Sequence, residues 1–379
     1  MDRPSTSRAG LLLPGGGARG AYQVGVLKAI AELNGSRRNP FPVVIGVSVG
    51  AINAAFMAAH AQSFNVGVTR LVDLWSNLRT DDVFRTDFAS VAKYGVRWLL
   101  SLTLGGLGVA NPRSFFDNAP LERLLKRVIP LPLIRQAIDS GDLRAVGISA
   151  SSYNRGSAVT FVQSVDGIVE WRRARRESRL CEITIDHVLA SLALPFMFPA
   201  RKIDTEYFGD GSLRLTAPLS PAIHLGADKI LVIGARDLKR DQVPKDPTAV
   251  AYPNLGLLAG YMLDLIFLDN LDNDIERLQR INRTLGLLDD EARDQSELRP
   301  IEVMTIEPSQ DLRAIAGQHA REVPAAVRML LRGIGAWNEE WRLPSYILFE
   351  PPYIRHLLEL GYADAMARRD TLAGFLGLK

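Results

Sequence analysis

Cysteine and histidine are scarce in this chain. Its 379 residues include one cysteine, Cys181, which excludes a disulfide within the chain and any cysteine-rich zinc site. The five histidines are scattered, and none stands in the HExxH spacing of zinc hydrolases. We therefore expect the protein to work without a metal and without a cofactor.

A large excess of either charge is also absent. Lysine and arginine number 45 against 42 acidic residues, which gives a net charge of +3. This balance does not indicate a nucleic-acid partner. One basic run stands out, made of Arg172, Arg173, Arg175, Arg176 and Arg179. It is typical of a solvated surface, and the alternative is a surface for anionic lipid headgroups.

No hydrophobic run has the length and composition of a membrane-spanning helix, which needs about 20 mostly apolar residues. Residues 39–69 carry no charge, but their glycines, serines and asparagines fit a buried strand, a tight turn and a helix. The first apolar run, residues 11–13, ends at Pro14 and is too short for a signal peptide. Residues 98–110 and 255–268 are apolar enough to touch lipid. We expect a cytoplasmic protein with peripheral membrane contact.

The order of apolar runs and glycine turns predicts an α/β protein. Two buried strands, at residues 11–13 and 43–45, are each followed by a glycine turn and a helix. Strand, helix and strand in this order indicate a parallel sheet with right-handed crossovers. Further strands are expected at residues 144–153, 158–163, 229–233 and 301–306.

The second half of the chain is mainly helical in pattern. Residues 255–288 predict one long amphipathic helix or two in series. After residue 311 the pattern is helical to the end. Pro351 and Pro352 predict the start of one helix, and Gly361 predicts its end.

The segment Gly46-Val47-Ser48-Val49-Gly50 fits the GxSxG pattern of a nucleophile elbow. An apolar strand precedes it and a helix of small residues follows. In this context the turn lifts the serine hydroxyl above the sheet, and the helix N-terminus behind it favours a developing negative charge. The pattern therefore predicts that Ser48 is a nucleophile.

A second glycine motif lies between the first strand and the first helix. Gly15, Gly17 and Gly20 fit GxGxxG, so a dinucleotide-binding turn is one hypothesis. That fold also uses an acidic residue after the second strand, and this chain has none there. The other hypothesis is an oxyanion hole. In it the turn lies beside Ser48 and its bare N–H groups face the reacting carbonyl oxygen.

A serine nucleophile needs a base, and Asp210 is the candidate. It begins an Asp-Gly turn after an apolar strand, although a simple β-turn is the alternative for any Asp-Gly. His224, His319 and His356 all follow Asp210, in the chain order of a Ser-Asp-His triad. A general carboxylesterase with such a triad is therefore a competing hypothesis.

The motifs GGGARG, GVSVG and DGS, in this order, resemble those of the patatin-like phospholipases. The stretch over residues 190–234 is also similar, with a helix ending in Ala-x-x-Pro, a strand, Asp-Gly, a proline, Gly-Ala-Asp and another strand. The resemblance implies a three-layer α/β/α fold with a mostly parallel central sheet and C-terminal helices. It implies a catalytic domain over residues 8–310, with a helical C-terminal extension over residues 311–379 packed on it.

The resemblance also implies an activity. It indicates a lipid acyl hydrolase of the phospholipase A or lysophospholipase type that cleaves carboxylic esters through an acyl-enzyme. Ser48 would be the nucleophile and Asp210 the base of a Ser-Asp dyad. Ser212 departs from the small residue that usually follows Asp-Gly, and a hydrogen bond from it would lower the basicity of Asp210.

The same resemblance assigns the glycine turn. Gly15, Gly16 and Gly17 would form the oxyanion hole, and Arg19 would hold or polarise that loop. Pro14 stands where the family often has a small or acidic residue. This departure removes no catalytic group.

Overall fold

A computed structural model describes residues 8–35, 38–86, 114–235, 252–267, 269–338 and 340–378. These residues form one ten-stranded sheet. Its strands are β1 (Ala9–Leu13), β2 (Val43–Val47), β3 (Ala145–Ser152), β4 (Ser157–Ser164), β5 (Arg172–Arg173), β6 (Arg176–Leu180), β7 (Arg201–Ile203), β8 (Glu206–Asp210), β9 (Lys229–Ile233) and β10 (Glu302–Ile306).

The sheet is mixed and mostly parallel, as predicted. Its order is β10-β9-β1-β2-β3-β4-β6-β5, and the neighbours from β10 to β3 all run parallel. β3 and β4, both predicted as strands, form an antiparallel hairpin. β8 pairs antiparallel with the far end of β3, beyond the end of β2, and with β7. This last arrangement decides where Asp210 lies.

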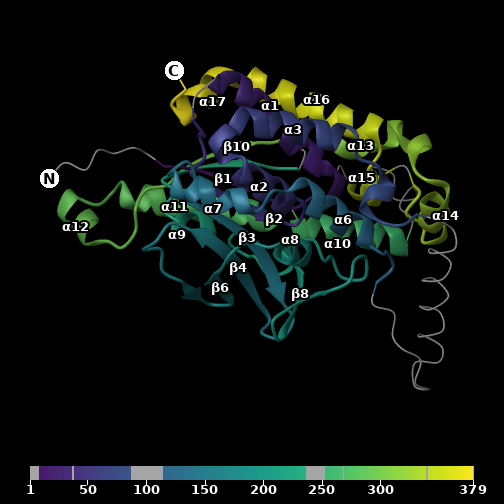
Figure 1. Cartoon of the computed structure of the whole chain (residues 1–379), viewed down its shortest axis with the longest axis horizontal. Coiled ribbons are helices and arrows are strands. Elements are labelled where there is room, and N and C mark those ends of the chain that lie inside the picture. Colours follow the sequence, from purple (N-terminus) through teal and green to yellow (C-terminus); the bar gives the residue numbers. More distant parts are fainter. Residues whose placement is uncertain are drawn as a thin grey trace.

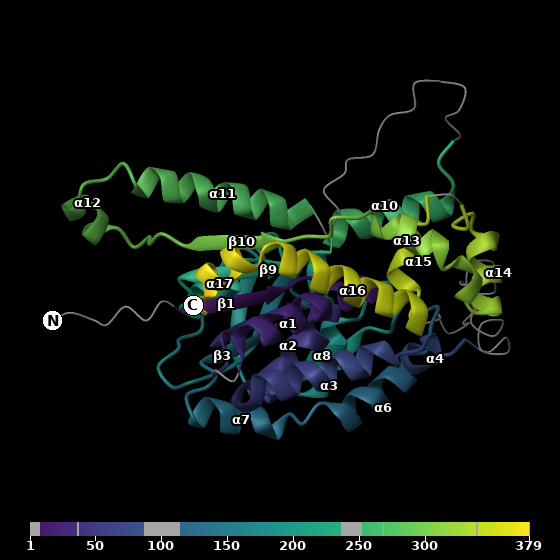
Figure 2. The same cartoon turned by 90° about the horizontal axis from the view of Figure 1, so that it is seen from above.

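Helices cover both faces of the sheet (Figures 1 and 2). They are α1 (Gly20–Asn34), α2 (Val49–Ala59), α3 (Phe64–Ser76), α4 (Thr80–Val83), α6 (Ala119–Val128), α7 (Pro132–Asp139), α8 (Ile185–Ser191), α9 (Ser220–His224), α10 (Leu255–Phe267), α11 (Asp269–Leu285), α12 (Asp290–Gln295), α13 (Leu312–Gln318), α14 (Ala325–Gly333), α15 (Arg342–Ile347), α16 (Pro351–Ala367) and α17 (Arg369–Leu376). Residues 255–267 and 269–285 are helical, as predicted.

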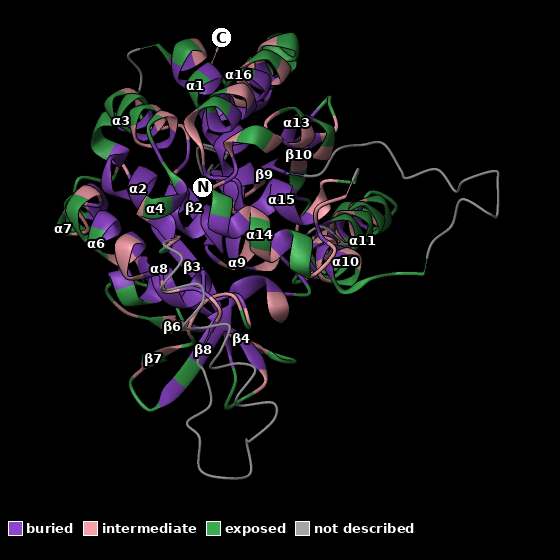
Figure 3. Ribbon diagram, turned by 90° about the vertical axis from the view of Figure 1, so that its right-hand side faces the viewer, coloured by how far each residue is buried: buried purple, intermediate pink, exposed green. Residues whose placement is uncertain are grey.

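Alternation along the strands explains the three layers. Leu11 and Leu13 point into the larger core, which contains residues of α1, α2, α3 and α16. Leu12 points the other way, into a second core that includes Leu219 and Ala222 near α9 and Leu278 of α11. Both faces of the central strands are therefore buried, as a parallel sheet requires (Figure 3).

The predicted end of a helix at Gly361 is wrong, because α16 continues through it to Ala367. Gly361 serves packing instead. A Cβ there would lie 2.2 Å from the carbonyl oxygen of Tyr22, and a Cβ at Gly25 would lie 2.1 Å from that of Leu358. The two glycines let α16 lie directly along α1, which joins the C-terminal helices to the sheet domain.

Candidate active site

Ser48 lies on a sharp turn between β2, which ends at Val47, and α2, which begins at Val49. Its φ of 53° is rare for a residue with a side chain, and such strain concentrates at functional sites. The turn needs glycine close by, since a Cβ at Gly50 would lie 1.9 Å from the carbonyl oxygen of Leu13. The predicted strand–turn–helix context of the GxSxG motif is therefore present.

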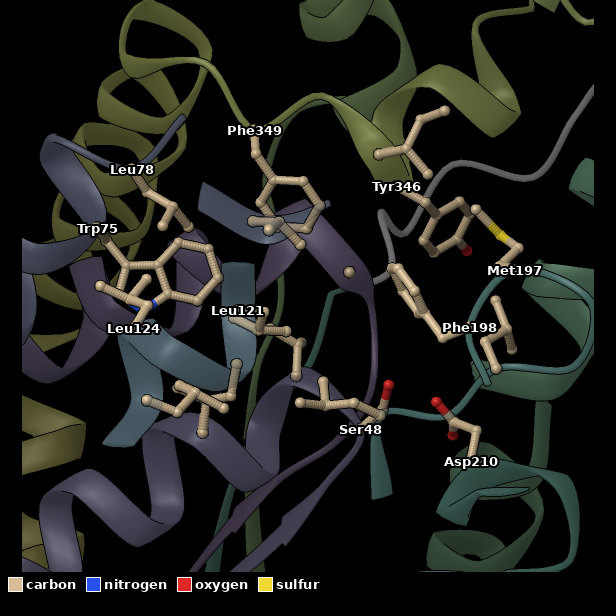
Figure 4. Close-up of a pocket in the computed structure, with 18 of the residues that line it drawn as sticks. Ser48, Trp75, Leu78, Leu121, Leu124, Met197, Phe198, Asp210, Tyr346 and Phe349 are labelled. Atoms are coloured by element: carbon tan, nitrogen blue, oxygen red, sulfur yellow. The ribbon is translucent and has the colours of Figure 1, made fainter. Parts of the chain in front are cut away.

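The sheet register brings Asp210 to Ser48. Along β3, Ser149 pairs with Val47 of β2, and the next residue, Ala150, pairs with Asp210 of β8. The C-terminal ends of β2 and β8 thus meet along the same edge of β3. Figure 4 shows the Ser48 hydroxyl and the Asp210 carboxylate pointing toward one another.

The Asp210 carboxylate is completely buried. Its Oδ1 accepts a hydrogen bond of 2.9 Å from the N–H of Ser212, while its Oδ2 is buried and accepts none from the described residues. Burial raises the pKa of Asp210 to about 6, and the Ser48 hydroxyl and the Ser212 amide and hydroxyl oppose that rise. A carboxylate with this pKa is a better proton acceptor than an exposed aspartate.

The histidines lie elsewhere, and all five are within the described residues. None of them lines the cavity that contains Ser48 and Asp210. His224 stacks on Trp171 with ring centroids 4.8 Å apart, and His319 contacts His356 at 3.2 Å. The structure therefore brings the predicted Ser48 and Asp210 together without any of the three candidate histidines.

The glycine loop follows β1 and lies beside this pair. Gly17 lines the same cavity as Ser48. The N–H groups of Gly15, Gly16 and Gly17 donate to no acceptor among the described residues. The loop is tightly covered, because a Cβ at Gly17 would lie 2.2 Å from the carbonyl oxygen of Tyr346. That contact leaves little room for a dinucleotide over the loop.

Arg19 is buried and does not line the cavity that contains Ser48. Its guanidinium donates to the Ser345 hydroxyl at 2.6 Å and lies 3.8 Å from the centroid of the Tyr346 ring. It also lies 4.0 Å from the Asp264 carboxylate. Of the two predicted roles for Arg19, these contacts favour holding the loop against α10 and α15.

Three polar residues that support the site lie outside the sequence motifs and were not predicted. The hydroxyl of Ser191 accepts from the N–H of Ser48 at 2.8 Å and donates to the carbonyl of Ser149 at 2.6 Å, which fixes the elbow to β3. Gln23 donates to the carbonyl of Pro14 at 2.8 Å, just before the glycine loop. Asn53 donates to Gln23 at 3.0 Å.

An apolar cavity opens at Ser48. In Figure 4 it extends from Ser48 and Asp210 toward Trp75 and Leu78. Its other aliphatic and aromatic walls are Val49, Ile52, Leu74, Val83, Leu121, Leu124, Leu125, Leu192, Leu194, Met197, Phe198, Leu263, Phe267, Tyr346, Ile347 and Phe349. The last three come from α15 and the segment that follows it, which the sequence motifs did not implicate in the site.

The model of one protein family matches the chain: the patatin-like phospholipases, over residues 11–223. The match spans more than half of the chain and includes the glycine loop, Ser48 and Asp210. The chain belongs to the patatin-like phospholipase family. Members of this family are serine hydrolases that act on lipid acyl esters, which agrees with an apolar cavity that opens at a serine. No curated protein matches the chain.

The other predictions concern membrane segments, metal ligands and surface charge. Within the described residues, no helix is long and apolar enough to cross a membrane. In the same part of the chain, no cluster of three potential ligands could hold a metal ion. The arginine run lies on β5 and β6 at the sheet edge, where Arg172 and Arg179 pair with Glu177. Residues 98–110 lie outside the described residues.

Proposed function

We propose that this protein hydrolyses the carboxylic ester of a lipid by means of a Ser48–Asp210 dyad. The observation that carries the proposal is the meeting of these two side chains at the end of an apolar cavity that no histidine lines. The family membership supports lipid as the substrate class. The support for the finer assignment, to phospholipase A or lysophospholipase chemistry, is a cavity whose walls suit acyl chains.

The first half of the reaction acylates the enzyme. The Ser48 oxygen attacks the ester carbonyl carbon while Oδ2 of Asp210 accepts the hydroxyl proton. The tetrahedral intermediate then collapses and the carbon–oxygen bond to the alcohol breaks. Asp210 returns its proton to that leaving oxygen. The products are acyl-Ser48 and the free alcohol, and Asp210 is again ionised.

The second half releases the acid. Asp210 accepts a proton from water, and the hydroxide oxygen attacks the acyl carbonyl. The bond to the Ser48 oxygen breaks, and this oxygen takes the proton from Asp210. The raised pKa of Asp210 suits both directions of transfer, because a pKa near the working pH lets one group act as base and then as acid.

The carbonyl oxygen becomes negative in each tetrahedral intermediate, and the glycine loop is the proposed donor site. The N–H group of Gly17 is the best placed, since Gly17 lines the cavity. Gly15 and Gly16 complete the turn, and Arg19 holds it. Donors fixed in this way are worth about 2.7–4 kcal/mol each when the charge develops.

The proposal also assigns the parts of the chain. Residues 8–310 are the catalytic domain, and residues 311–379 are a helical extension that packs on it. This extension supplies Tyr346, Ile347 and Phe349 to the cavity wall. We expect a cytoplasmic enzyme in peripheral contact with a membrane surface, because its substrate resides there.

The test is a digest of mixed lipids by the wild type and by Ser48→Ala, read by mass spectrometry. The wild type should release fatty acid, and Ser48→Ala should release none. Ser296→Ala is the control, since Ser296 lies near α12, outside the cavity. Equal fatty-acid release by wild type and Ser48→Ala would refute the proposal.

A further inference from the structure

One side of α10 carries a continuous apolar surface. Leu255, Leu258, Tyr261, Met262 and Leu265 recur at helical spacing, and each side chain is between 47% and 65% exposed. We call these five residues the α10 surface. Figure 3 shows the exposed side of α10 at the outside of the molecule. A contiguous apolar face of this kind marks an interaction site.

Charge is missing from the α10 surface. Between residues 252 and 267 the only charged residue is Asp264, and it turns inward. Its carboxylate accepts a hydrogen bond of 2.6 Å from the Tyr346 hydroxyl and pairs with Arg342. No ionised group of α10 therefore opposes burial of this surface in an apolar phase.

The opposite side of α10 closes the active site. Leu263 and Phe267 line the cavity that contains Ser48. The Phe267 ring lies so close to the glycine loop that a Cβ at Gly15 would be 2.4 Å from its Cδ1. The helix that carries the α10 surface is thus also a wall of the cavity.

Positive charge lies next to the α10 surface. The N-terminal end of α10 packs on the chain after α14, where the N–H of Gly256 donates to the carbonyl of Ile334 at 2.8 Å. α14 carries the exposed Arg332, whose guanidinium lies over the Trp337 ring. The neighbouring Arg328 is half-buried and donates to the carbonyls of Arg321 and Val323. No carboxylate of the described residues forms an ion pair with Arg332. Apolar and aromatic residues beside an exposed basic side chain are typical of helices that lie in a lipid interface.

We propose that the α10 surface docks on an anionic lipid layer, with Arg332 facing the headgroups. The inference rests on the proposed lipid hydrolysis and names how the enzyme meets its substrate. A lipid layer fits better than a second copy of the chain, because the cavity behind α10 suits an acyl chain and the neighbouring Arg332 suits anionic headgroups. The acyl chain then reaches Ser48 past Leu263 and Phe267.

The test uses vesicles of equal parts phosphatidylglycerol and phosphatidylcholine, with co-sedimentation at 0.1 M salt. We expect Leu258→Glu/Leu265→Glu to bind at least tenfold more weakly and to hydrolyse vesicle lipid correspondingly more slowly. Its hydrolysis of a water-soluble short-chain ester should not change, because neither residue lines the cavity. Leu287→Glu is the matched control, since Leu287 is 87% exposed outside α10, and it should bind like the wild type.

Charge is tested separately. Arg332→Glu should weaken binding by about fivefold or more, and higher salt should reduce the effect by screening. Arg172→Glu, on β5, should leave binding unchanged. The docking proposal would be overturned by wild-type binding in Leu258→Glu/Leu265→Glu. Dimerisation of the wild type through the α10 surface, or loss of vesicle binding in Arg172→Glu but not Arg332→Glu, would also overturn it.

The two proposals fail in different ways. A wild type that binds vesicles but hydrolyses neither lipid nor soluble ester would refute the proposed hydrolysis and leave the docking surface standing. A wild type that hydrolyses soluble ester but does not bind vesicles would refute the docking surface and leave the proposed hydrolysis standing.

Discussion

Replacement of Asp210 by asparagine should stabilise the folded protein at neutral and alkaline pH, although it removes the proposed base. The Asp210 side chain is completely buried, and burial raises its pKa from 3.8 to about 6. In the unfolded chain the same carboxyl loses its proton near pH 4. As the pH rises from about 4 to about 6, the unfolded state ionises first. The free energy of unfolding therefore falls over this range.

The size of the effect follows from the pKa difference. At 1.36 kcal/mol for each pH unit, the ionised Asp210 costs the folded state about 3 kcal/mol above pH 6. Asparagine carries no charge, and its carbonyl oxygen can still accept from the Ser212 N–H. The Asp210→Asn variant should thus be up to about 3 kcal/mol more stable at pH 8. For a chain of this length, that difference raises Tm by about 4 °C.

The assay is thermal unfolding of wild type and Asp210→Asn from pH 4 to pH 8. The two Tm values should lie close together at pH 4 and separate as the pH rises through 6. Asp166→Asn, at an exposed loop position, is the control and should differ little from wild type at any pH. An Asp210→Asn protein that is no more stable than wild type at pH 8 would refute the argument that a buried charge is maintained for catalysis.

Four further results are expected. The kcat/KM for a soluble ester should rise with pH to a plateau above about pH 6, because Asp210 must be ionised to accept a proton; an acid limb near pH 4 would contradict this. Gly17→Ala should lower kcat by about a hundredfold or more in steady-state assays, with a smaller change in KM, because the new Cβ would meet the Tyr346 carbonyl and displace the N–H donors of the loop. Gln23→Met should lower kcat but not KM if Gln23 positions the glycine loop through Pro14, and an equal loss of folded protein would indicate a purely structural role. Trp75→Ala should shift hydrolysis toward longer acyl chains in a chain-length series, because Trp75 lies at the cavity end away from Ser48.

Local patterns in the sequence predicted the elements that hold the site. β9 spans Lys229–Ile233, which is the predicted range. A short run of apolar β-formers between two turns is typical of a buried strand. The strand–turn–helix context of Ser48 could also be predicted, because the GxSxG motif places small residues at a fixed spacing. The prediction at Gly361 was wrong because the sequence alone does not distinguish a glycine that ends a helix from one that lets two helices pack closely.

Contacts between distant residues could not be predicted in the same way. Ser191 supports the turn at Ser48 across 143 residues, and Ser345 binds Arg19 across 326. Neither serine lies in a motif, and only the folded chain shows what each one contacts. The contribution of Tyr346 and Phe349 to the cavity is of the same kind, because it depends on how α15 and the segment after it pack over the glycine loop.

The central claim is that Ser48 and Asp210 act together without a histidine. The most direct measurement is kcat/KM for one ester substrate in Ser48→Ala, Asp210→Asn, the double variant and His224→Ala. The dyad predicts losses of about a thousandfold or more in each single variant of the pair, and a double variant that is little worse, because the two groups act as a unit. It predicts wild-type activity in His224→Ala. Near-normal activity in Asp210→Asn together with a large loss in His224→Ala would contradict the account.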